Sequence, residues 1–117
     1  MKLELGDVQT TALIPLAIKA NETLRENPRI KDYKAVEIIS SLNIDTEQYD
    51  KFMSHEGVVA RTIMLDRQLK SIIEKYPDTT VVNIGAGFDD RFSRVDNGKI
   101  FALLLPNINN RWATFEW

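Results

Sequence analysis

The residues with the clearest chemical potential follow a short apolar run near the middle of the second half of the chain. The run Val81–Ile84 leads into Gly85-Ala86-Gly87, and Asp89 follows two residues later. Such a run is typical of a buried parallel strand, and glycines let the backbone turn sharply and approach a ligand closely. A helix beginning near Phe88 would direct free N–H groups into that turn. This order predicts a site for a nucleotide-type cofactor, although a plain tight turn has the same pattern.

Position 90 narrows the class of cofactor. Dinucleotide-binding turns need a small third residue where the helix packs on the strand, and Asp90 stands at that position. This argues against NAD and FAD and leaves cofactors without a pyrophosphate, of which S-adenosylmethionine is the obvious one. A phosphate-binding loop is disfavoured, because no Lys-Ser/Thr pair follows the glycines.

The elements that must position this turn are mostly helices. A first helix is predicted after a cap at Thr10 or Thr11, and it ends before Asn27-Pro28. Asp32 is predicted to cap a second helix. The longest helix should run from Ser54 to Tyr76, because Pro77 cannot continue it. A second buried strand is predicted over 100–105, after a turn at Asp96-Asn97-Gly98.

The long helix carries both an apolar stripe and charged residues. The predicted stripe is Val58, Thr62, Leu65, Leu69, Ile72 and Tyr76. Asp66, Arg67 and Lys70 are expected on a solvated face, whereas Arg61 is a candidate exception because apolar residues flank it. His55, the only histidine, is interpreted as a polar residue at the helix start rather than a catalytic base.

Composition describes an ordinary soluble domain and excludes several function classes. The chain has 117 residues, a formal charge of −2, 44% hydrophobic residues and no cysteine. It therefore offers no disulfide framework, no thiolate metal site and no basic face for nucleic acid. No signal peptide is recognisable, and no apolar run reaches the ~18 residues that span a membrane. We expect a cytoplasmic protein with neither nucleic-acid nor membrane partners.

Four segments resemble the leucine carboxyl methyltransferase and polyketide O-methyltransferase family, whose enzymes use S-adenosylmethionine. They occur in the family's order and are Thr11–Leu16, Lys31–Ile38, Ala60–Asp66 and Val81–Phe92. The resemblance implies an α/β fold in which a helical cap precedes the start of a class I, Rossmann-like methyltransferase sheet. The cap would cover residues 1–78, and the first strands would lie in 79–117.

The resemblance also implies the site. Arg61 would pair with the carboxylate of S-adenosylmethionine, a sensible partner for a guanidinium fork. Gly85, Ala86 and Gly87 would lie against the methionine part, and Asp89 would position the cofactor or cap a helix. The methyl group would pass to a carboxylate or hydroxyl oxygen of a small molecule. This transfer demands alignment and exclusion of water but no metal, and no catalytic residue is assigned.

Two departures from the family suggest a truncated enzyme. The family's acidic pair, which binds the ribose, has no counterpart in Ala102–Pro106. A doubly wound domain also usually takes about 150 residues or more. We therefore expect a weak or inactive methyltransferase. The alternative is a non-enzymatic truncated relic that acts as a helical self-association or interaction module. An exposed edge of the strand Val81–Ile84 would then drive self-association.

Overall fold

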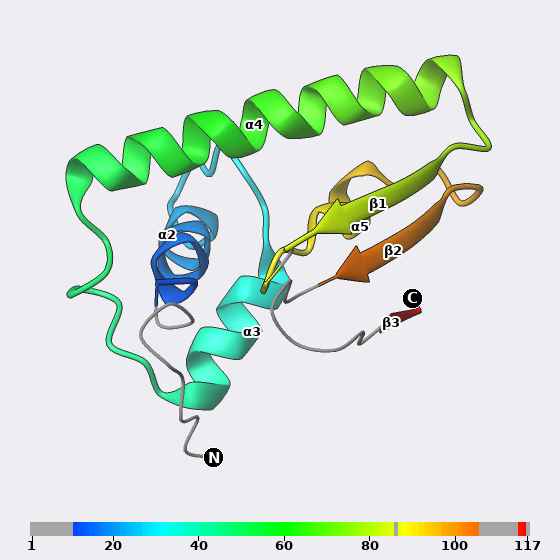
Figure 1. Ribbon diagram of the computed structural model, residues 1–117. Coiled ribbons are helices and arrows are strands. Elements are labelled where there is room, and N and C mark those ends of the chain that lie inside the picture. Colours follow the sequence, from blue (N-terminus) through cyan, green and yellow to red (C-terminus); the bar gives the residue numbers. More distant parts are fainter. Residues whose placement is uncertain (1–10, 86, 106–114, 117) are drawn as a thin grey trace. The chain divides into compact units, whose positions relative to one another are not determined.

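The structure is a computed structural model that describes residues 11–85, 87–105 and 115–116 (Figure 1). In chain order the elements are α2 (Leu13–Thr23), α3 (Tyr33–Leu42), α4 (Phe52–Lys75), β1 (Thr80–Ile84), α5 (Arg91–Val95), β2 (Phe101–Leu105) and β3 (Phe115–Glu116). Contacts divide the chain into two compact units, Met1–Leu65 and Asp66–Trp117. The helix α4 therefore begins in the first unit and ends in the second.

The first unit is built on α2, which packs against α3. The centre of α2 is fully buried, with Ala17 and Ile18 at 0% exposure. Ile18 also contacts Val58 and Val59 on α4, with Ile14 and Ile63 packed around them. Burying one such side chain contributes about 1.5–3 kcal/mol, so these few residues account for much of the unit's cohesion.

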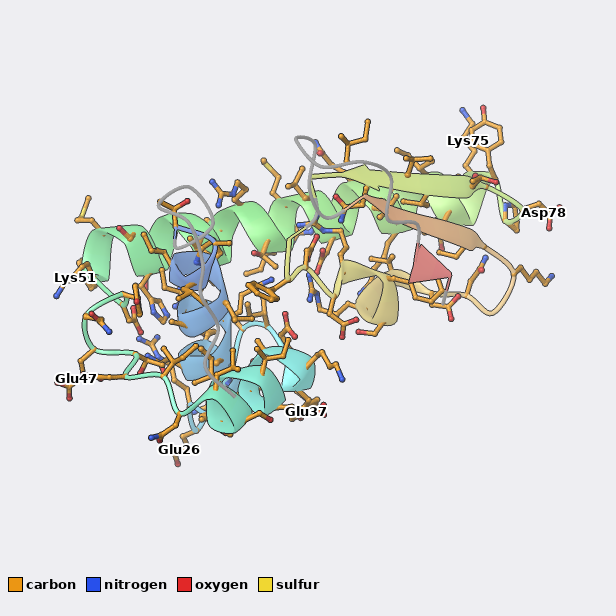
Figure 2. The ribbon with its side chains drawn as sticks, turned by 60° about the horizontal axis from the view of Figure 1, so that its bottom comes forward. Glu26, Glu37, Glu47, Lys51, Lys75 and Asp78 are labelled. Atoms are coloured by element: carbon orange, nitrogen blue, oxygen red, sulfur yellow. The ribbon has the colours of Figure 1, made fainter. Side chains whose placement is uncertain are left out.

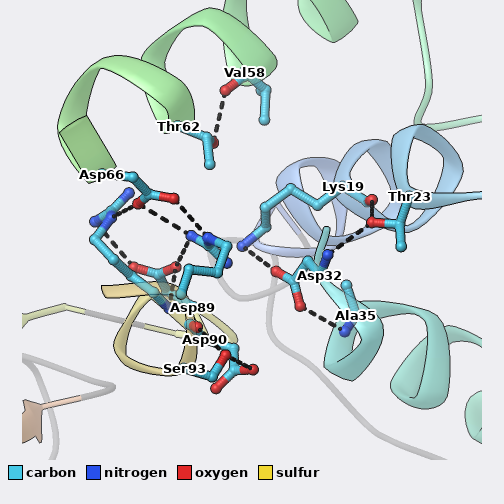
Figure 3. A network of polar contacts seen from close by, with 12 residues as sticks. Lys19, Thr23, Asp32, Ala35, Val58, Thr62, Asp66, Asp89, Asp90 and Ser93 are labelled. Carbon is cyan, nitrogen blue, oxygen red and sulfur yellow. Dashed lines mark hydrogen bonds and ion pairs between the residues drawn. The ribbon is translucent and has the colours of Figure 1, made fainter. Parts of the chain in front are cut away.

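The start of α3 is fixed by a buried aspartate. The Oδ1 atom of Asp32 accepts a hydrogen bond of 3.0 Å from the backbone N–H of Ala35. Its Oδ2 atom lies 3.4 Å from the Nζ atom of Lys19, and its own N–H donates to the hydroxyl of Thr23 at 2.9 Å (Figure 3). The predicted Asp32 cap is confirmed, and the same residue also ties α3 to α2.

The other predicted helix ends are confirmed only in part. The predicted long helix is confirmed within two residues, since α4 covers Phe52–Lys75 and Pro77 follows it. The predicted threonine cap of the first helix is wrong for Thr11, because Ala12 is the N-cap of α2 and makes no side-chain bond. Thr10 lies outside the described residues.

The buried side of α4 differs from the predicted apolar stripe. Val58 and Thr62 are buried as expected, but Leu65, Ile72 and Tyr76 are exposed. The buried positions instead continue from Thr62 through Asp66, the half-buried Leu69 and Ile73. These residues follow at intervals of four, three and four, which is an equally good helical stripe.

The second unit contains a small sheet in the order β1-β2-β3. The strand β1 pairs in parallel with β2, from Thr80 opposite Phe101 to Ile84 opposite Leu105. The strand β3 is antiparallel to β2. The turn predicted before β2 is confirmed, since Gly98 has a φ of 79° and its N–H donates to Asp96 at 2.8 Å.

One face of β1 contributes to the core of this unit. Ile73 on α4, Val95 on α5 and Ile100 form the buried cluster. Leu69, Val81 and Phe92 pack against that cluster.

The predicted fold class, an α/β chain beginning a Rossmann-like sheet after a helical cap, is wrong. The described chain is mostly helical: α2, α3 and α4 have 11, 10 and 24 residues, whereas no strand exceeds five. The expected burial of the first strand is also wrong. Val82 and Ile84 are 49% and 65% exposed, whereas strands of a Rossmann sheet are covered on both faces.

Charged side chains lie on the outer surface of each unit (Figure 2). In the first unit Glu26, Glu37, Glu47 and Lys51 are exposed and point away from the ribbon. In the second unit Lys75 and Asp78 do the same. The solvated face expected on α4 is correct for Arg67 and Lys70, but it is wrong for Asp66, which is buried.

The neighbouring isoleucines of α4 test the corrected stripe. Ile73→Ala should lower the free energy of unfolding by about 2–4 kcal/mol, because Ile73 is 4% exposed and its loss leaves a cavity. Ile72→Ala, at 49% exposure, should cost less than about 1 kcal/mol. Urea unfolding followed by circular dichroism measures both. Equal losses for the two variants would contradict the observed side of burial.

Candidate functional site

The turn after β1 has the backbone geometry that its glycines permit. Gly85 has a φ of 66° and Gly87 a φ of 56°, both in the left-handed region. A side chain at either position would be strained, so glycine is required by conformation alone. Both residues are exposed. Ala86, between them, lies outside the described residues.

Asp89 closes this turn from its far side. Its Oδ2 atom accepts a hydrogen bond of 2.9 Å from the Nδ2 atom of Asn83, the residue before the last of β1. Its Oδ1 atom accepts one of 3.2 Å from the backbone N–H of Arg91. One carboxylate therefore joins the chain before the glycines to the chain after them.

The helix that follows the turn differs from the expected one. It begins at Arg91 rather than near Phe88, and α5 has only five residues. Its N-cap position is Asp90, which makes no side-chain cap bond, whereas Asp89 accepts a hydrogen bond from the backbone N–H of Arg91, the first residue of α5. A helix this short has little macrodipole, and the turn owes its order to side-chain bonds instead.

Asp89 is one of four charged residues that form what we call the arginine–aspartate cluster: Asp66, Asp89, Arg91 and Arg94. Asp66 on α4 accepts a hydrogen bond of 2.7 Å from the Nε atom of Arg91 and one of 2.6 Å from that of Arg94. Asp89 lies 3.1 Å from Arg91 and 3.6 Å from Arg94. Figure 3 shows the carboxylates of Asp66 and Asp89 with dashed lines that mark their contacts.

The cluster is formally neutral and largely withdrawn from solvent. Its side chains are 10–20% exposed. Charged groups removed from water to this extent are retained only when they are paired. Each arginine contacts both aspartates, so the four residues act as one unit.

Arg61 belongs to a different unit from the glycine turn. It is an exposed residue of α4 within the first unit, whereas Gly85, Gly87 and Asp89 belong to the second. Within the part of the chain that the structure describes, no hydrogen bond or ion pair involves Arg61. Its predicted pairing with a ligand carboxylate therefore stays a prediction.

Sequence reasoning missed Asp66, Arg91 and Arg94. Asp66 was expected in solvent, yet it is 8% exposed and lies on the buried stripe between Thr62 and Leu69. The feature of the sequence that could have revealed this cluster is an acidic residue at a buried position of the helical stripe. A buried aspartate needs a cation, and Arg91 and Arg94 stand three residues apart beside the glycine turn.

A second buried charge network lies in the first unit. The single histidine, His55, is 3% exposed, and its ring lies between two carboxylates. Its Nε2 atom is 2.7 Å from Glu22 and its Nδ1 atom 2.7 Å from Asp50. We call these three residues the histidine clamp. The two contacts, one on each ring nitrogen, fix the orientation of the ring between the acids.

Glu22 is the centre of this network, with its side chain at 0% exposure. Arg29 donates to it from its backbone N–H at 3.0 Å and from its Nε atom at 2.9 Å, and Arg25 lies 3.2 Å away. The hydrogen bonds from Arg29 lower the pKa of Glu22 well below its usual range. The bond from His55 acts in the same direction, and burial opposes it. Glu22 is thus held as a carboxylate.

Arg29 also forms an ion pair with an exposed acid, Glu56. Its two terminal nitrogens donate to Glu56 at 2.7 and 3.0 Å, a bidentate pair. These hydrogen bonds lower the pKa of Glu56, and the two acids together raise the pKa of Arg29. The N-terminal part of α4, which contains Glu56, is thereby joined to Arg29, which lies before α3.

Two classes of site receive no support from the described residues. Over those ranges no group of three His, Asp or Glu side chains has an arrangement that would hold a metal ion. None of the helices described there is both long and apolar enough to cross a membrane.

Comparisons with known proteins give no relative. No protein-family model, curated protein or solved structure matches this chain. The resemblance to carboxyl and polyketide methyltransferases accordingly stays a hypothesis from the residues.

Replacing the buried acid of the clamp tests its role. Glu22→Gln should lower the free energy of unfolding at neutral pH by roughly 3 kcal/mol, because a neutral amide replaces the buried carboxylate to which Arg29 and His55 bond. Glu26→Gln, an exposed position four residues on, should change it by less than about 0.5 kcal/mol. Chemical unfolding of the three proteins measures the difference.

The effect should also depend on pH. The folded-state pKa of Glu22 is depressed, so its contribution is fully present above the ordinary value of 4.5 and is lost as the pH falls through the folded-state value. The difference between the parent protein and Glu22→Gln should therefore shrink in acid. A difference that stays constant from neutral pH to strong acid would contradict the assignment.

Proposed function

We propose that the chain belongs to an S-adenosylmethionine-dependent O-methyltransferase that acts on a carboxyl or hydroxyl group of a small molecule. The observation that carries the proposal is the turn after β1. Its glycines adopt φ values of 66° and 56°, and Asp89 closes it by bonding to Asn83. A turn of this kind exposes backbone where a ligand can approach without meeting a Cβ atom.

The residues of this turn fit the methionine part of that ligand. Gly85 and Gly87 are exposed, and the carboxylate of Asp89 already bonds to Asn83 and to the backbone of Arg91, so these contacts are in place before any ligand binds. Preorganisation of this kind lowers the entropic cost of binding. Ala86 is proposed as part of the same contact.

Arg61 is proposed to bind the carboxylate of the ligand. Its guanidinium is exposed, and a planar fork of donors suits a carboxylate bidentately. An exposed arginine with no ion pair among the described residues is available for this role without breaking an existing bond.

Methyl transfer requires few functional groups from the protein. When bound, S-adenosylmethionine supplies a sulfonium methyl group, whose C–S bond breaks as a C–O bond to the acceptor forms and whose electron pair stays on sulfur. The protein must align the acceptor oxygen with the methyl group and exclude water. Gly85, Gly87, Asp89 and Arg61 would hold the donor for that alignment.

We expect little transfer from these 117 residues alone. The family's ribose-binding acid has no counterpart among Ala102–Leu105, and one charge-assisted hydrogen bond is worth about 1.5–3 kcal/mol. We further propose a cytoplasmic location, where the methyl donor is made.

Calorimetric titration with S-adenosylmethionine tests the proposal. The parent chain should bind saturably, and Arg61→Ala should weaken binding by about tenfold or more through loss of a charge-assisted bond. Arg67→Ala is the matched control, because Arg67 is also an exposed arginine of α4. It should leave the affinity unchanged.

Two results would overturn the proposal. One is the absence of heat of binding up to millimolar ligand with a folded parent chain. The other is an equal loss of affinity in Arg61→Ala and Arg67→Ala, since that would reflect general charge rather than a specific contact.

A second candidate function, self-association without catalysis, is favoured by β1. This strand is at the edge of the sheet order β1-β2-β3, and Val82 and Ile84 are 49% and 65% exposed. An apolar edge strand with unpaired backbone groups is a template for pairing with another chain.

Light scattering over a range of concentrations tests this second candidate. The parent chain should associate, and Ile84→Lys should return it to monomer by placing a charge on the edge strand. Ile72→Lys, on α4 at 49% exposure, is the control and should still associate. A monodisperse parent monomer at all concentrations would exclude the candidate.

A further inference from the structure

A series of side-chain contacts joins the glycine turn to α4. Asp89, which closes the turn, lies 3.1 Å from Arg91 and 3.6 Å from Arg94. Both arginines in turn donate to Asp66 on α4, at 2.7 and 2.6 Å. Asp66 is separated from these arginines by 25 and 28 residues of sequence.

The balance of charge in the arginine–aspartate cluster determines which group Asp89 bonds to. With Asp66 present, the Nε atom of each arginine is bonded to that residue, and Asp89 keeps its 2.9 Å bond to Asn83. Without the charge of Asp66, two guanidinium groups face one carboxylate. Guanidinium groups bond carboxylates more strongly than an amide does, so Asp89 would be drawn away from Asn83.

We propose that Asp66 is a positioning residue for the glycine turn and thereby for the methyl donor. Because Asp66 bonds to Arg91 and Arg94, Asp89 keeps its bond to Asn83. That bond joins the residues before the turn to those after it. This inference rests on the proposed function for its ligand. Its structural part, control of the turn from α4, stands independently of that ligand.

Asp66 has no other visible task in the described structure. Both of its oxygens are bonded to the two arginines, with a further contact of 3.3 Å from the Nη2 atom of Arg94 to Oδ1. It is 8% exposed, so water supplies little compensation when its charge is removed. The effect of removing it should therefore pass through the arginines.

The experiment labels the full chain with ¹⁵N-glycine and compares backbone amide signals in folded protein. The chain has five glycines, of which Gly57 and Gly98 serve as internal references. Three variants are compared with the parent chain: Asp66→Asn, the double variant Asp66→Asn with Arg94→Gln, and the control Glu74→Gln. Glu74 is an exposed acid of α4 with no described partner, so its removal changes charge alone. Each protein is also titrated with S-adenosylmethionine.

The proposal expects a specific pattern. Asp66→Asn should shift or broaden the signals of Gly85 and Gly87, leave those of Gly57 and Gly98 in place, and weaken ligand binding about tenfold. Glu74→Gln should change neither. The double variant restores neutrality, so its glycine signals and its affinity should return towards those of the parent chain.

Several outcomes would overturn the proposal. Gly85 and Gly87 signals that coincide with those of the parent in folded Asp66→Asn would show that α4 does not control the turn. Shifted signals of Gly85 and Gly87 with an unchanged affinity for S-adenosylmethionine would show that Asp66 affects the turn but not ligand binding. If Asp66→Asn does not fold, Arg94→Gln is compared instead. It leaves one guanidinium between two carboxylates, so Asp89 should keep its bond to Asn83 and the signals of Gly85 and Gly87 should stay in place; signals that shift would overturn the proposal.

Failure of the proposed function is recognised separately. A parent chain that binds no S-adenosylmethionine rejects the methyl donor as ligand. The glycine signals still decide whether Asp66 holds the turn, since they are recorded without ligand. A merely stabilising role for Asp66 would lower the unfolding free energy but leave the glycine signals of the folded protein unmoved.

Discussion

A carboxylate withdrawn from water must be surrounded by cations, and this constraint shapes both units. Glu22 is at 0% exposure and receives Arg25, Arg29 and His55 from three parts of the chain. Asp66 is 8% exposed and receives Arg91 and Arg94. Leaving either acid unpaired would cost several kcal/mol, so the segments that carry its partners are committed to one arrangement. The apolar clusters supply cohesion, and the buried acids specify which loops meet which helices.

Local features of the fold could be read from the sequence. Asp32 caps α3 because a short acceptor before a helix reaches the N–H three residues on, and Pro77 ends α4 because it has no N–H to donate. The turn at Asp96-Asn97-Gly98 likewise depends on neighbouring residues only. The positive φ values at Gly85 and Gly87 also fit the interpretation of a glycine-dependent turn.

Features that depend on distant residues could not be read in this way. The helix α4 has apolar residues on more than one side, and nothing local selects Ile73 over Ile72 for burial. That selection is made by Val95 and Ile100, which lie far along the chain. Glu22 and His55 are 33 residues apart, and the charges themselves look like ordinary surface residues in sequence. The fold class failed for a related reason: a short β-branched run before glycines is common to many sheets, and coverage of its second face depends on elements elsewhere.

The histidine clamp also limits what the single histidine of the chain can do. Its two ring nitrogens lie 2.7 Å from Glu22 and from Asp50, and the residue is 3% exposed. A substrate that reached either nitrogen would first have to displace one of these carboxylates, and a displaced Glu22 would stay buried without that partner. The ring instead joins three segments of the first unit, so replacing it would loosen α2, the start of α4 and the loop before α4 at once.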